Sequence, residues 1–591
     1  MFEYYHLSVL VDRQADKYGD RTILRYRDYE TDRWLSVSWK QFAAINHRTA
    51  EAMAAFGVRE EENVAIFSQN KPECFYMEYG CYMNRAVAVP VYATSSKYQL
   101  RYILNEAEIR LLFVGEQQQY DIAMEALPDS PCVERLVLLD KQIMRLPDDT
   151  LSVYFEDFLN EGTPESAATV AERTARASND DLANILYTSG TTGEPKGVML
   201  HHTCYLECFR IHDIRLEGMN DTDVSMNFLP LTHVFEKAWC HLCIHKGVEI
   251  CVNLRPTDIQ NTIKEIRPTM MCNVPRFWEK VYAGVQEKIN NSRGLMQRIM
   301  KDAVTTGRIY NVECRRVGKT PPLWIRWKYA FYNKTVYQVL KKTIGVERGR
   351  LFPTAGAAIP DAVYEFVRAV GIQMIAGYGL TESTATVSCA WGAYFCPGSV
   401  GTVMPDVQVR ISDSGEVLLR GKTISKGYYK KPAETAAAID ADGWFHTGDL
   451  GRMEGNELFL GERIKDLFKT SNGKYIAPQA LELKLVVDKY VDQIAIIADG
   501  RKFVSALIVP DYGMVEEYAN KQGIVYSDRI SLLAHPDVRS LFESRIAAQQ
   551  ETFNPYERIK RFTLLAHPFN MEKGELTNTL KLKRRTIAEN Y

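Results

Sequence analysis

A loop from Thr188 to Gly197 carries the groups in this chain that are most able to do chemistry. It reads Thr-Ser-Gly-Thr-Thr-Gly-Glu-Pro-Lys-Gly and follows a short apolar run, Ala183 to Tyr187, which predicts a buried strand. Glycines let backbone N–H groups point at an anion, while the hydroxyls and the Lys196 ammonium add further donors. We therefore expect the loop to bind phosphate oxygens, although an ordinary polar turn has a similar composition.

The spacing of this loop differs from that of a Walker A loop. A Walker A loop has Gly, four residues and then Gly-Lys-Ser or Gly-Lys-Thr, whereas Gly193 is followed here by Glu-Pro-Lys-Gly. The loop thus indicates nucleotide phosphates but disfavours a Walker-type ATPase or kinase. The candidate phosphate-binding residues are Thr188, Ser189, Gly190, Thr191, Thr192, Gly193 and Lys196.

A second segment, Gly377 to Ser383, supplies groups that a nucleotide and its metal would need. It reads Gly-Tyr-Gly-Leu-Thr-Glu-Ser and follows an apolar run from Met374 to Ala376. Tyr378 can stack on a nucleobase, Thr381 can bind a phosphate, and the Glu382 carboxylate can hold Mg²⁺.

Three further motifs carry charged groups. Asp449, in Trp-Phe-His-Thr-Gly-Asp-Leu, offers a carboxylate to ribose hydroxyls, and Arg463, in Gly-Glu-Arg-Ile-Lys-Asp, offers a second ribose contact. Near the C-terminus, Lys581 lies in Leu-Thr-Asn-Thr-Leu-Lys-Leu-Lys-Arg-Arg, with Lys583 as the alternative cation. Singly, each residue has an ordinary explanation, such as a turn for Asp449 or a solvated charge for Lys581.

The elements that must position these groups alternate between helix and strand in the first part of the chain. Ser38 can cap an amphipathic helix from Trp39 to about Phe56, which ends at Gly57. Strands follow at Val64–Phe67, Ala86–Val91 and Leu111–Val114, and helices at Pro72–Met83 and about Tyr98–Ala107. This alternation predicts an α/β fold with mostly parallel sheets covered by helices, in which ligands collect after the carboxyl ends of strands.

The region after Leu460 has a different pattern. Two apolar runs, Ile494–Ile497 and Phe503–Val509, flank the dipeptide Asp499-Gly500, which is a strong hairpin signal. A chain of 591 residues is also too long for one core. We expect a large N-terminal domain over residues 1–462 and a small α+β domain over residues 463–591.

Composition narrows the class of protein. Hydrophobic residues make up 46% and charged residues 25%, as in soluble globular proteins, and the net charge of -2 disfavours a dedicated nucleic-acid binder. The sequence shows neither a long apolar run nor a signal-peptide pattern, so we expect a cytoplasmic location. The twelve cysteines lie mostly within apolar stretches, which predicts reduced, buried thiols. A zinc or redox site at Cys240 and Cys243 is disfavoured, because the pair lacks a second ligand pair or a thioredoxin-like context.

An insertion at about 294–350 is unusually basic. From Lys301 to Arg350 it holds twelve basic residues against three acidic ones, an excess of nine, with interleaved aromatics such as Trp324 and Trp327. One interpretation is a peripheral contact with the inner face of a membrane. The other is a helical insertion with a solvated basic face and aromatics in the core. Nucleic acid is less favoured, since the rest of the chain has no basic surplus.

Taken together, these motifs resemble the adenylate-forming superfamily of acyl-CoA synthetases, luciferases and peptide-synthetase adenylation domains. The motifs follow the superfamily's order over nearly the whole chain. Within it, the chain most resembles long-chain fatty acid–CoA ligases. That closer resemblance rests on Pro-Leu-Thr-His-Val-Phe-Glu at 230–236, on Asn-Val-Pro-Arg-Phe-Trp-Glu-Lys at 273–280, on the basic insertion and on the ending Thr579–Arg584.

The resemblance implies a two-step reaction that uses ATP, Mg²⁺ and coenzyme A. A fatty acid and Mg·ATP would give acyl-AMP and pyrophosphate, and the thiol of coenzyme A would then displace AMP. Lys581 would bridge the acyl carboxylate and the α-phosphate, Thr381 and Glu382 would serve the phosphates and the metal, and His233 would lie beside the acyl carboxylate. A structural role is the alternative for His233.

The resemblance also implies an adenine-contacting loop and a moving domain. Gly356 and Ala357 would contact adenine, and the small domain would rotate about Lys465 between the two steps. Three positions depart from the family pattern: alanines flank Gly356 in a loop that is often richer in glycine, Glu462 stands where glycine is usual, and Asn578 stands where proline is usual. None of these removes a chemical group that the reaction needs.

Two other functions stay open at this point. A medium-chain, aryl or acyl-carrier-protein ligase would keep the same motifs, and an inactive relative would only bind acyl lipid or a membrane. The sequence leaves chain-length preference open, and it is compatible with an oligomer.

Overall fold

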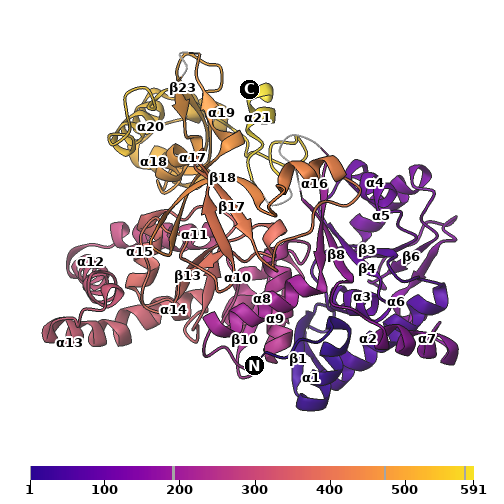
Figure 1. Ribbon diagram of the computed structural model, residues 1–591. Helices are drawn as coiled ribbons and strands as arrows, with labels where there is room; N and C mark the ends of the chain where they lie inside the picture. Colours follow the sequence, from indigo (N-terminus) through magenta and orange to yellow (C-terminus); the bar gives the residue numbers. More distant parts are fainter. Residues whose placement is uncertain (1, 189–193, 472–473, 578–580) are drawn as a thin grey trace.

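The computed structural model describes residues 2–188, 194–471, 474–577 and 581–591. In these residues, the larger part of the chain contains sheets of seven, four and eight strands, and a smaller C-terminal part contains sheets of two and three strands. Figure 1 shows the C-terminal part, in yellow and orange, packed beside the rest. The expected mixed α/β fold with a small C-terminal domain is confirmed, whereas the boundary at 462/463 stays a prediction.

The seven-stranded sheet has the order β7-β6-β5-β3-β4-β8-β9, and its strands run parallel except for the pair β8 and β9. Every residue of β3 is buried: Val64 and Ile66 face one hydrophobic core, and Ala65 and Phe67 face another. A strand buried on both faces needs helices on both faces. The strands are β3 (Asn63–Ser68), β4 (Val87–Tyr92), β5 (Leu111–Val114), β6 (Arg135–Leu138), β7 (Ser152–Tyr154), β8 (Leu182–Thr188) and β9 (Lys196–His201).

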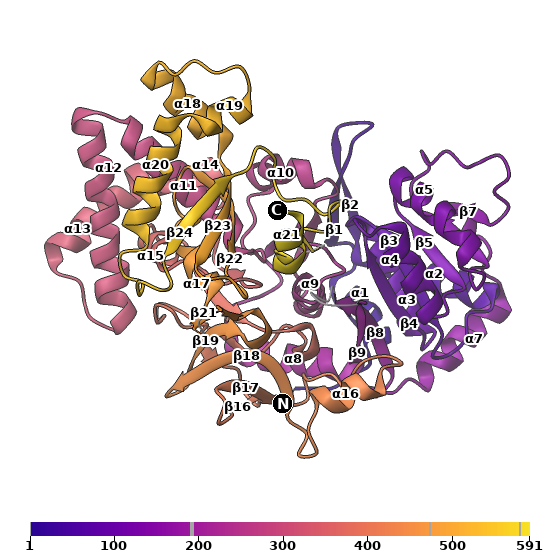
Figure 2. The same cartoon turned by 90° about the horizontal axis from the view of Figure 1, so that it is seen from above.

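Helices cover this sheet on both sides, as Figure 2 shows. Helices α2 (Trp39–Phe56) and α3 (Pro72–Met83) join one core, while α4 (Lys97–Glu106) and α5 (Gln117–Ala126) join the other. The helix expected after Ser38 is confirmed at both ends. The Ser38 hydroxyl accepts from Gln41 N–H at 3.2 Å, and Gly57 ends the helix in the left-handed region at φ 92°.

Two further sheets complete the larger part. A four-stranded sheet has the order β10-β11-β1-β2, formed by β1 (Thr22–Asp28), β2 (Arg33–Ser38), β10 (Val224–Asn227) and β11 (Glu249–Val252). An eight-stranded sheet has the order β12-β13-β14-β15-β19-β18-β17-β16, in which only β12 and β13 pair in parallel. It includes β14 (Ser388–Cys389), β15 (Thr402–Val403), β16 (Gln408–Ile411) and β17 (Glu416–Arg420). The strands that concern the site are β12 (Phe352–Thr354), β13 (Met374–Tyr378), β18 (Phe445–Glu454) and β19 (Glu457–Arg463). The helices that concern it are α8 (His202–Arg215), α9 (Val234–Lys246) and α11 (Pro275–Asn291).

The loop from Thr188 to Gly197 joins two antiparallel strands. Thr188 of β8 pairs with Lys196 of β9, and Tyr187 pairs with Gly197. The expected strand before the loop is confirmed, but the loop is a hairpin connection rather than the strand-to-helix crossover typical of parallel sheets. Gly197 allows this close pairing, because a Cβ at that position would lie 2.6 Å from Ile185 Cγ2.

The small C-terminal part has its own hydrophobic core. The expected hairpin is confirmed as β22 (Val491–Ile497) and β23 (Val504–Pro510), and β24 (Ile559–Leu564) adds a parallel third strand. Side chains such as Ile494, Ile496 and Phe542 are buried in a core of their own. The covering helices are α17 (Pro478–Leu485), α18 (Tyr512–Gln522), α19 (Arg529–Ala534) and α20 (Pro536–Gln549).

The basic insertion is helical and lies at one edge of the molecule, at the left in Figures 1 and 2. It contains α12 (Gly294–Gly307), α13 (Leu323–Tyr332) and α14 (Gln338–Ile344), joined in part by π-helical turns. Asp302 of α12 holds α13 in place, since it accepts from Lys328 Nζ at 2.7 Å and from the Tyr332 hydroxyl at 2.5 Å. Among the residues described, no helix combines the length and apolar character needed to cross a membrane.

Candidate active site

Three residues predicted from separate motifs form one cluster on the eight-stranded sheet. Asp449 of β18 pairs in register with Arg463 of β19, so their side chains are neighbours. The Asp449 carboxylate accepts from the Tyr378 hydroxyl at 2.6 Å and from Arg463 Nε at 2.9 Å. Burial and the nearby Asp449 raise the pKa of Tyr378, so its hydroxyl keeps the proton that it donates. We call Tyr378, Asp449 and Arg463 the ribose cluster, after the predicted role of its charged members.

Gly356 and Ala357 follow a strand that neighbours the strand of Tyr378. They follow β12, which pairs in parallel with β13, and Thr354 is the register partner of Ala376. The loops that leave the two strands therefore start from the same sheet edge. Both residues are exposed, and Gly356 adopts φ 92°. The geometry is compatible with a surface that receives a flat base, and adenine contact stays a prediction.

Thr381 and Glu382 lie in a single 3-10 turn, Thr381–Ser383, just after β13. The Tyr428 hydroxyl donates to Glu382 Oε1 at 2.8 Å, and the N–H of Ser425 donates to the Glu382 carbonyl at 2.7 Å. Tyr428 was missed by the sequence analysis, because a tyrosine in Gly-Tyr-Tyr-Lys-Lys-Pro carries no local sign of an active-site contact.

The predicted phosphate loop is described only at its ends. Thr188 Oγ1 donates to the carbonyl of Lys196 at 3.3 Å, and the Lys196 ammonium lies 5.1 Å from the centre of the Tyr428 ring. The candidates Ser189, Gly190, Thr191, Thr192 and Gly193 lie outside the described residues. Tyr428 thus lies between Lys196 on one side and Glu382 on the other.

Lys581 reaches this site from the small domain. Its pKa is lowered because the surrounding protein desolvates the ammonium, and because Arg463 repels it, although Asp449 and Asp466 act in the opposite direction. The residue retains exposed surface, so protein atoms surround the ammonium without sealing it from water. The backbone is anchored, since Thr577 N–H donates to the Lys581 carbonyl at 2.8 Å. Lys581 is therefore brought within electrostatic reach of the ribose cluster.

His233, on the large domain, lies within electrostatic reach of Lys581. The imidazole is the N-cap of α9 and accepts from Phe235 N–H at 3.3 Å through Nδ1. Burial, with the Lys581 charge as a smaller contribution, lowers the pKa of His233 to about 4, so the ring is neutral at pH 7. The fold thus brings His233, Lys581, Asp449 and Arg463 together, although they lie up to 348 residues apart in the sequence.

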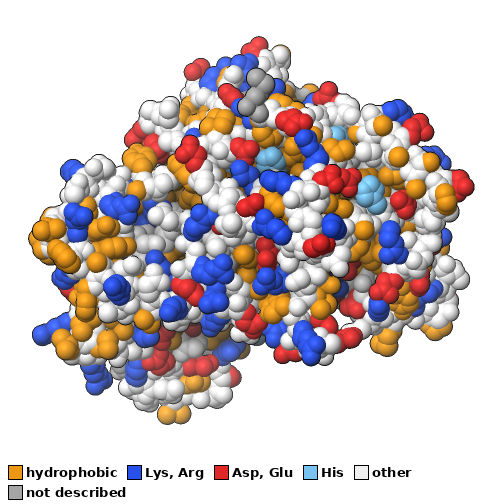
Figure 3. Space-filling view, turned by 90° about the horizontal axis from the view of Figure 1, so that it is seen from below, with side chains coloured by type: hydrophobic (Ala, Val, Ile, Leu, Met, Phe, Trp, Pro, Cys, Tyr) orange, Lys and Arg blue, Asp and Glu red, His pale blue; other side chains and the backbone are white. Residues whose placement is uncertain are grey.

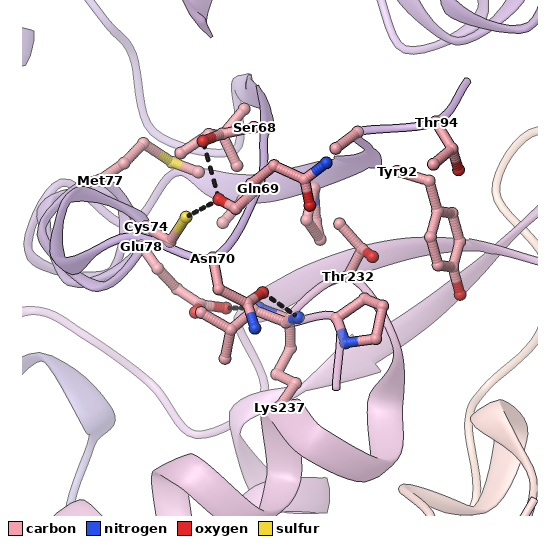
Figure 4. A pocket seen from close by; sticks show the side chains of 16 residues that line it. Ser68, Gln69, Asn70, Cys74, Met77, Glu78, Tyr92, Thr94, Thr232 and Lys237 are labelled. Atoms are coloured by element: carbon pink, nitrogen blue, oxygen red, sulfur yellow. Dashed lines mark hydrogen bonds and ion pairs between the residues drawn. The ribbon is translucent and has the colours of Figure 1, made fainter. Parts of the chain in front are cut away.

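A cavity of about 70 Å³ lies beside the residue that precedes His233. Figure 4 shows Thr232 and Lys237 among the residues that line it, together with Gln69, Asn70 and Thr94, which follow β3 and β4. The Lys237 ammonium is buried and pairs with Glu78 at 2.7 Å. This ion pair ties the first turn of α9 to α3, which helps to hold His233 in place.

The chain matches the family model of the AMP-binding enzymes over residues 11–429. The chain belongs to this family of AMP-binding enzymes. It is 30% identical over 571 residues to the long-chain-fatty-acid–CoA ligase FadD15 of Mycobacterium bovis, covering 94% of this chain and 91% of the relative. It is 28% identical over 585 residues to the human long-chain-fatty-acid–CoA ligase 1, covering 94% and 81%. The resemblance inferred from the motifs is confirmed.

Solved structures show the same fold at lower identity. The anthranilate CoA ligase AuaEII in complex with anthranoyl-AMP has a TM-score of 0.74 and 19% identity, covering 99% of this chain and 97% of that chain. The adenylation domain of a carboxylate reductase from Mycobacterium chelonae has a TM-score of 0.75 and 21% identity, covering 99% and 90%. These similarities place the AMP-binding fold over the full length of the chain.

In this AMP-binding enzyme, Glu462 and Lys465 lie at the predicted boundary between the large and small domains. The carboxylate of Glu462, the departure from the family glycine, accepts from Ala480 N–H at the start of α17 at 3.0 Å, and burial raises its pKa to about 7. Lys465 lies in the short turn Ile464–Asp466, and Asp466 pairs with Arg584 at 3.7 Å. The position of Lys465 fits a hinge, and the hinge role stays a prediction.

The described residues contain no group of three or more His, Cys, Asp or Glu side chains arranged to hold a metal ion. A magnesium ion held by nucleotide phosphates needs only one or two protein carboxylates. Glu382 has the chemistry for such a site, because its second carboxylate oxygen, Oε2, is left for a cation when Oε1 accepts from Tyr428.

Proposed function

We propose that this AMP-binding enzyme activates a long-chain fatty acid. In the first step, the fatty acid carboxylate attacks the α-phosphorus of ATP, acyl-AMP forms and pyrophosphate leaves. In the second step, the thiol of coenzyme A loses its proton and attacks the acyl carbon, the thioester forms and AMP leaves. The proposal is supported by the relatives of known name and, above all, by the placement of Lys581 within electrostatic reach of both His233 and the ribose cluster.

The catalytic contribution of the chain is alignment and charge neutralisation. The fatty acid supplies the nucleophile of the first step, so no Ser-His-Asp arrangement is required. A lysine placed between two anions, the acyl carboxylate and the α-phosphate, stabilises the charge that develops as they approach. Neutral His233 can line the acyl carboxylate site without adding a second positive charge beside Lys581.

The phosphates and the metal are assigned to the large domain. Thr188, Lys196 and the loop between them would hold the β- and γ-phosphates, and Thr381 would add a hydroxyl. Glu382 would hold Mg²⁺, which neutralises the phosphate charge when it is bound. Asp449 and Arg463 would hold the ribose, and Gly356, Ala357 and Tyr378 would contact adenine.

The small domain is proposed to move between the two steps. If Lys581 bridges the acyl carboxylate and the α-phosphate in the first step, it would stand close to the acyl carbon that the thiol of coenzyme A must reach in the second. A rotation about Lys465 would remove the lysine after the first step. A short turn that absorbs a large change in φ and ψ is the usual form of a hinge.

The experiment that tests the reaction is a coupled assay of AMP release with fatty acids from C6 to C20. We expect release that depends on ATP, Mg²⁺ and coenzyme A and that is greatest with long chains. A maximum at C6–C10, or with aryl acids, would favour another ligase of the same family, and replacement of coenzyme A by carrier protein would identify a carrier-protein ligase. The absence of AMP release with every acid would contradict the enzymatic proposal and favour an acyl-lipid-binding relative.

A second proposal is that the enzyme is cytoplasmic and that the helical insertion docks on the inner face of a membrane. One face of α13 exposes Trp324, Trp327 and Phe331, with 62%, 72% and 60% of their surface accessible. These residues are spaced at i, i+3 and i+7, which places them on one side of a helix. On the neighbouring helix α12, Leu295 and Met296 are also exposed.

Exposed cations flank this apolar face. They include Arg298 and Lys301 on α12, and Arg326 and Lys334 on and after α13. Figure 3 shows apolar and basic side chains interspersed at the end of the molecule that carries these helices. Aromatic rings with cations around them fit the interface of an anionic bilayer, where the rings enter the headgroup layer and the cations remain at the phosphates.

Co-sedimentation with vesicles tests this proposal. We expect binding to vesicles of phosphatidylcholine with phosphatidylglycerol, weaker binding to phosphatidylcholine alone, and at least tenfold weaker binding for the variant W324A/W327A/F331A. A control variant changes three exposed apolar residues elsewhere, Tyr98, Met144 and Ile530, to alanine. Equal loss in the two variants, or binding that is insensitive to salt, would contradict the docking face.

A further inference from the structure

A short segment from Gly427 to Lys431 runs along the free edge of the seven-stranded sheet. Tyr429 N–H donates to the Gly197 carbonyl at 2.8 Å, and Met199 N–H donates to the Gly427 carbonyl at 3.1 Å. Tyr428 forms an antiparallel bridge with Val198. Because β9 is the last strand of its sheet, this segment covers an edge that would otherwise be open, and it does so beside Lys196.

The side chain of Tyr428 connects two groups of the proposed site that are 186 residues apart. Its hydroxyl donates to Glu382 Oε1 at 2.8 Å, and its ring lies 5.1 Å from the Lys196 ammonium. The same stretch of chain makes a second contact with this turn, since Ser425 N–H donates to the Glu382 carbonyl. Glu382 is thus held through both its backbone carbonyl and its side-chain carboxylate.

These two contacts hold charged groups without neutralising them. A hydroxyl that donates to Oε1 restricts the rotamer of Glu382 and leaves Oε2 for a cation. An aromatic ring attracts an ammonium through its quadrupole and carries no net negative charge, so Lys196 keeps its full charge for a phosphate. A carboxylate in the place of Tyr428 would hold the lysine more strongly but would compete with the phosphate for it.

We propose that Tyr428 is a positioning residue that sets the placement of Glu382 relative to Lys196. The proposal rests on the function proposed above, in which Glu382 serves the metal and Lys196 the phosphates. The hydroxyl of Tyr428 acts on Glu382, and its ring acts on Lys196. Substitutions can therefore separate the contribution of the hydroxyl from that of the ring.

The variants Y428F and Y428L separate these two contributions, and Y429F is the matched control. Y428F loses the hydroxyl and keeps the ring, whereas Y428L loses both. The neighbouring Tyr429 accepts from Asn63 Nδ2 at 3.1 Å and packs against a different core, so Y429F removes a hydroxyl from the same segment without a contact to Glu382 or Lys196.

The measurements are the dissociation constants of ATP and AMP, by titration with and without Mg²⁺, and the Mg²⁺ dependence of ATP–pyrophosphate exchange. For Y428F we expect unchanged ATP binding in EDTA and about tenfold less strengthening of ATP binding by Mg²⁺, with a matching increase in the Mg²⁺ needed for exchange. For Y428L we expect ATP binding in EDTA to weaken in addition by about threefold. AMP binding, which lacks the β- and γ-phosphates, should stay unchanged in all variants.

Two results would overturn the proposal. One is a Y428F enzyme with the Mg²⁺ response of Y429F and wild type, and the other is an equal loss of AMP and ATP binding, which would indicate general damage to the fold. The reaction itself is tested separately: an absence of exchange in wild type with every fatty acid would contradict the proposed function, while the Mg²⁺ dependence of ATP binding would still decide the role of Tyr428.

Discussion

The two halves of the proposed active site are held in different ways. In the ribose cluster, hydrogen bonds of 2.6 and 2.9 Å to Asp449 fix side chains that belong to one sheet. Lys581, in contrast, is anchored through its backbone to Thr577, and its ammonium is brought to the site by the packing of the small domain.

Contacts between the two domains account for the position of Lys581. Arg276, at the start of α11, donates through Nη2 to the carbonyl of Asp492 at 2.8 Å and also contacts the Asp492 carboxylate. Val487 of the small domain packs against the large hydrophobic core. The nucleotide side is thus preorganised within one domain, whereas the lysine is placed by an interface that a rotation would break.

Loss of the Lys581 ammonium should have the largest effect, and on one half-reaction only. We expect K581A to lower ATP–pyrophosphate exchange by about 10²–10³, because a donor that neutralises developing charge is lost. Thioester formation from supplied acyl-AMP should be retained. The variant K583A is the control. If exchange survived in K581A but was lost in K583A, the role would belong to Lys583.

A rigid turn at Lys465 should affect the opposite half-reaction. We expect K465P to keep ATP–pyrophosphate exchange and to slow thioester formation by about a hundredfold, because proline restricts the turn that must change its φ and ψ. Single-turnover measurements of each step check this. Equal losses in both steps would contradict the hinge.

Damage to the ribose cluster should weaken both half-reactions together. D449N keeps an acceptor for Tyr378 but removes the charge that faces Arg463. We expect KM for ATP and KM for supplied acyl-AMP each to rise about tenfold, since both ligands contain the ribose. A change in only one of the two KM values would mean that the ribose cluster serves one half-reaction. It would contradict the proposal that the cluster, unlike Lys581, acts in both.

The Arg276–Asp492 contact should have a smaller effect, because both side chains are partly exposed and such pairs are weak. We expect R276A to lower exchange about threefold and to leave thioester formation from acyl-AMP unchanged, since the contact stabilises only the arrangement that holds Lys581 in the site. The charge-reversed pair R276D/D492R should restore part of the loss. R529A, which removes a surface pair within the small domain, is the control.

The smallest effect should be a pH dependence of stability from His233. Its pKa is near 4 in the folded chain and has an ordinary value of 6.5 when unfolded, so the unfolded state binds more protons between these values. The contribution of His233 to stability is therefore present above pH 6.5 and is lost as the pH falls towards 4. The variant H233N keeps an N-cap residue. Between pH 7 and pH 5, its melting temperature should fall less than that of wild type, with a difference on the order of 2 °C. An identical fall in both proteins would contradict the shifted pKa.

Local sequence rules predicted many elements well. The helix Trp39–Phe56 begins after a capping serine and ends at a left-handed glycine, and β3 coincides with a short apolar run that is buried throughout. Both signals lie within the element itself or next to its ends. The hairpin at Asp499-Gly500 was predicted for the same reason. The hairpin around Thr188–Gly197 was not, because the flanking runs alone do not show which strand pairs with which.

The amino-acid sequence already specifies the charged groups of the proposed site, which are Glu382, Asp449, Arg463 and Lys581, and the order in which they occur. Which of these groups become neighbours depends on the tertiary structure. The fold of the eight-stranded sheet placed Tyr378 against Asp449, although other strands lie between β13 and β18 in the sheet order. An edge segment brought Tyr428 between Lys196 and Glu382, and domain packing brought Lys581 within electrostatic reach of His233. The physical reason is range: caps, turns and burial patterns act over a few residues, whereas these contacts join residues dozens to hundreds of positions apart.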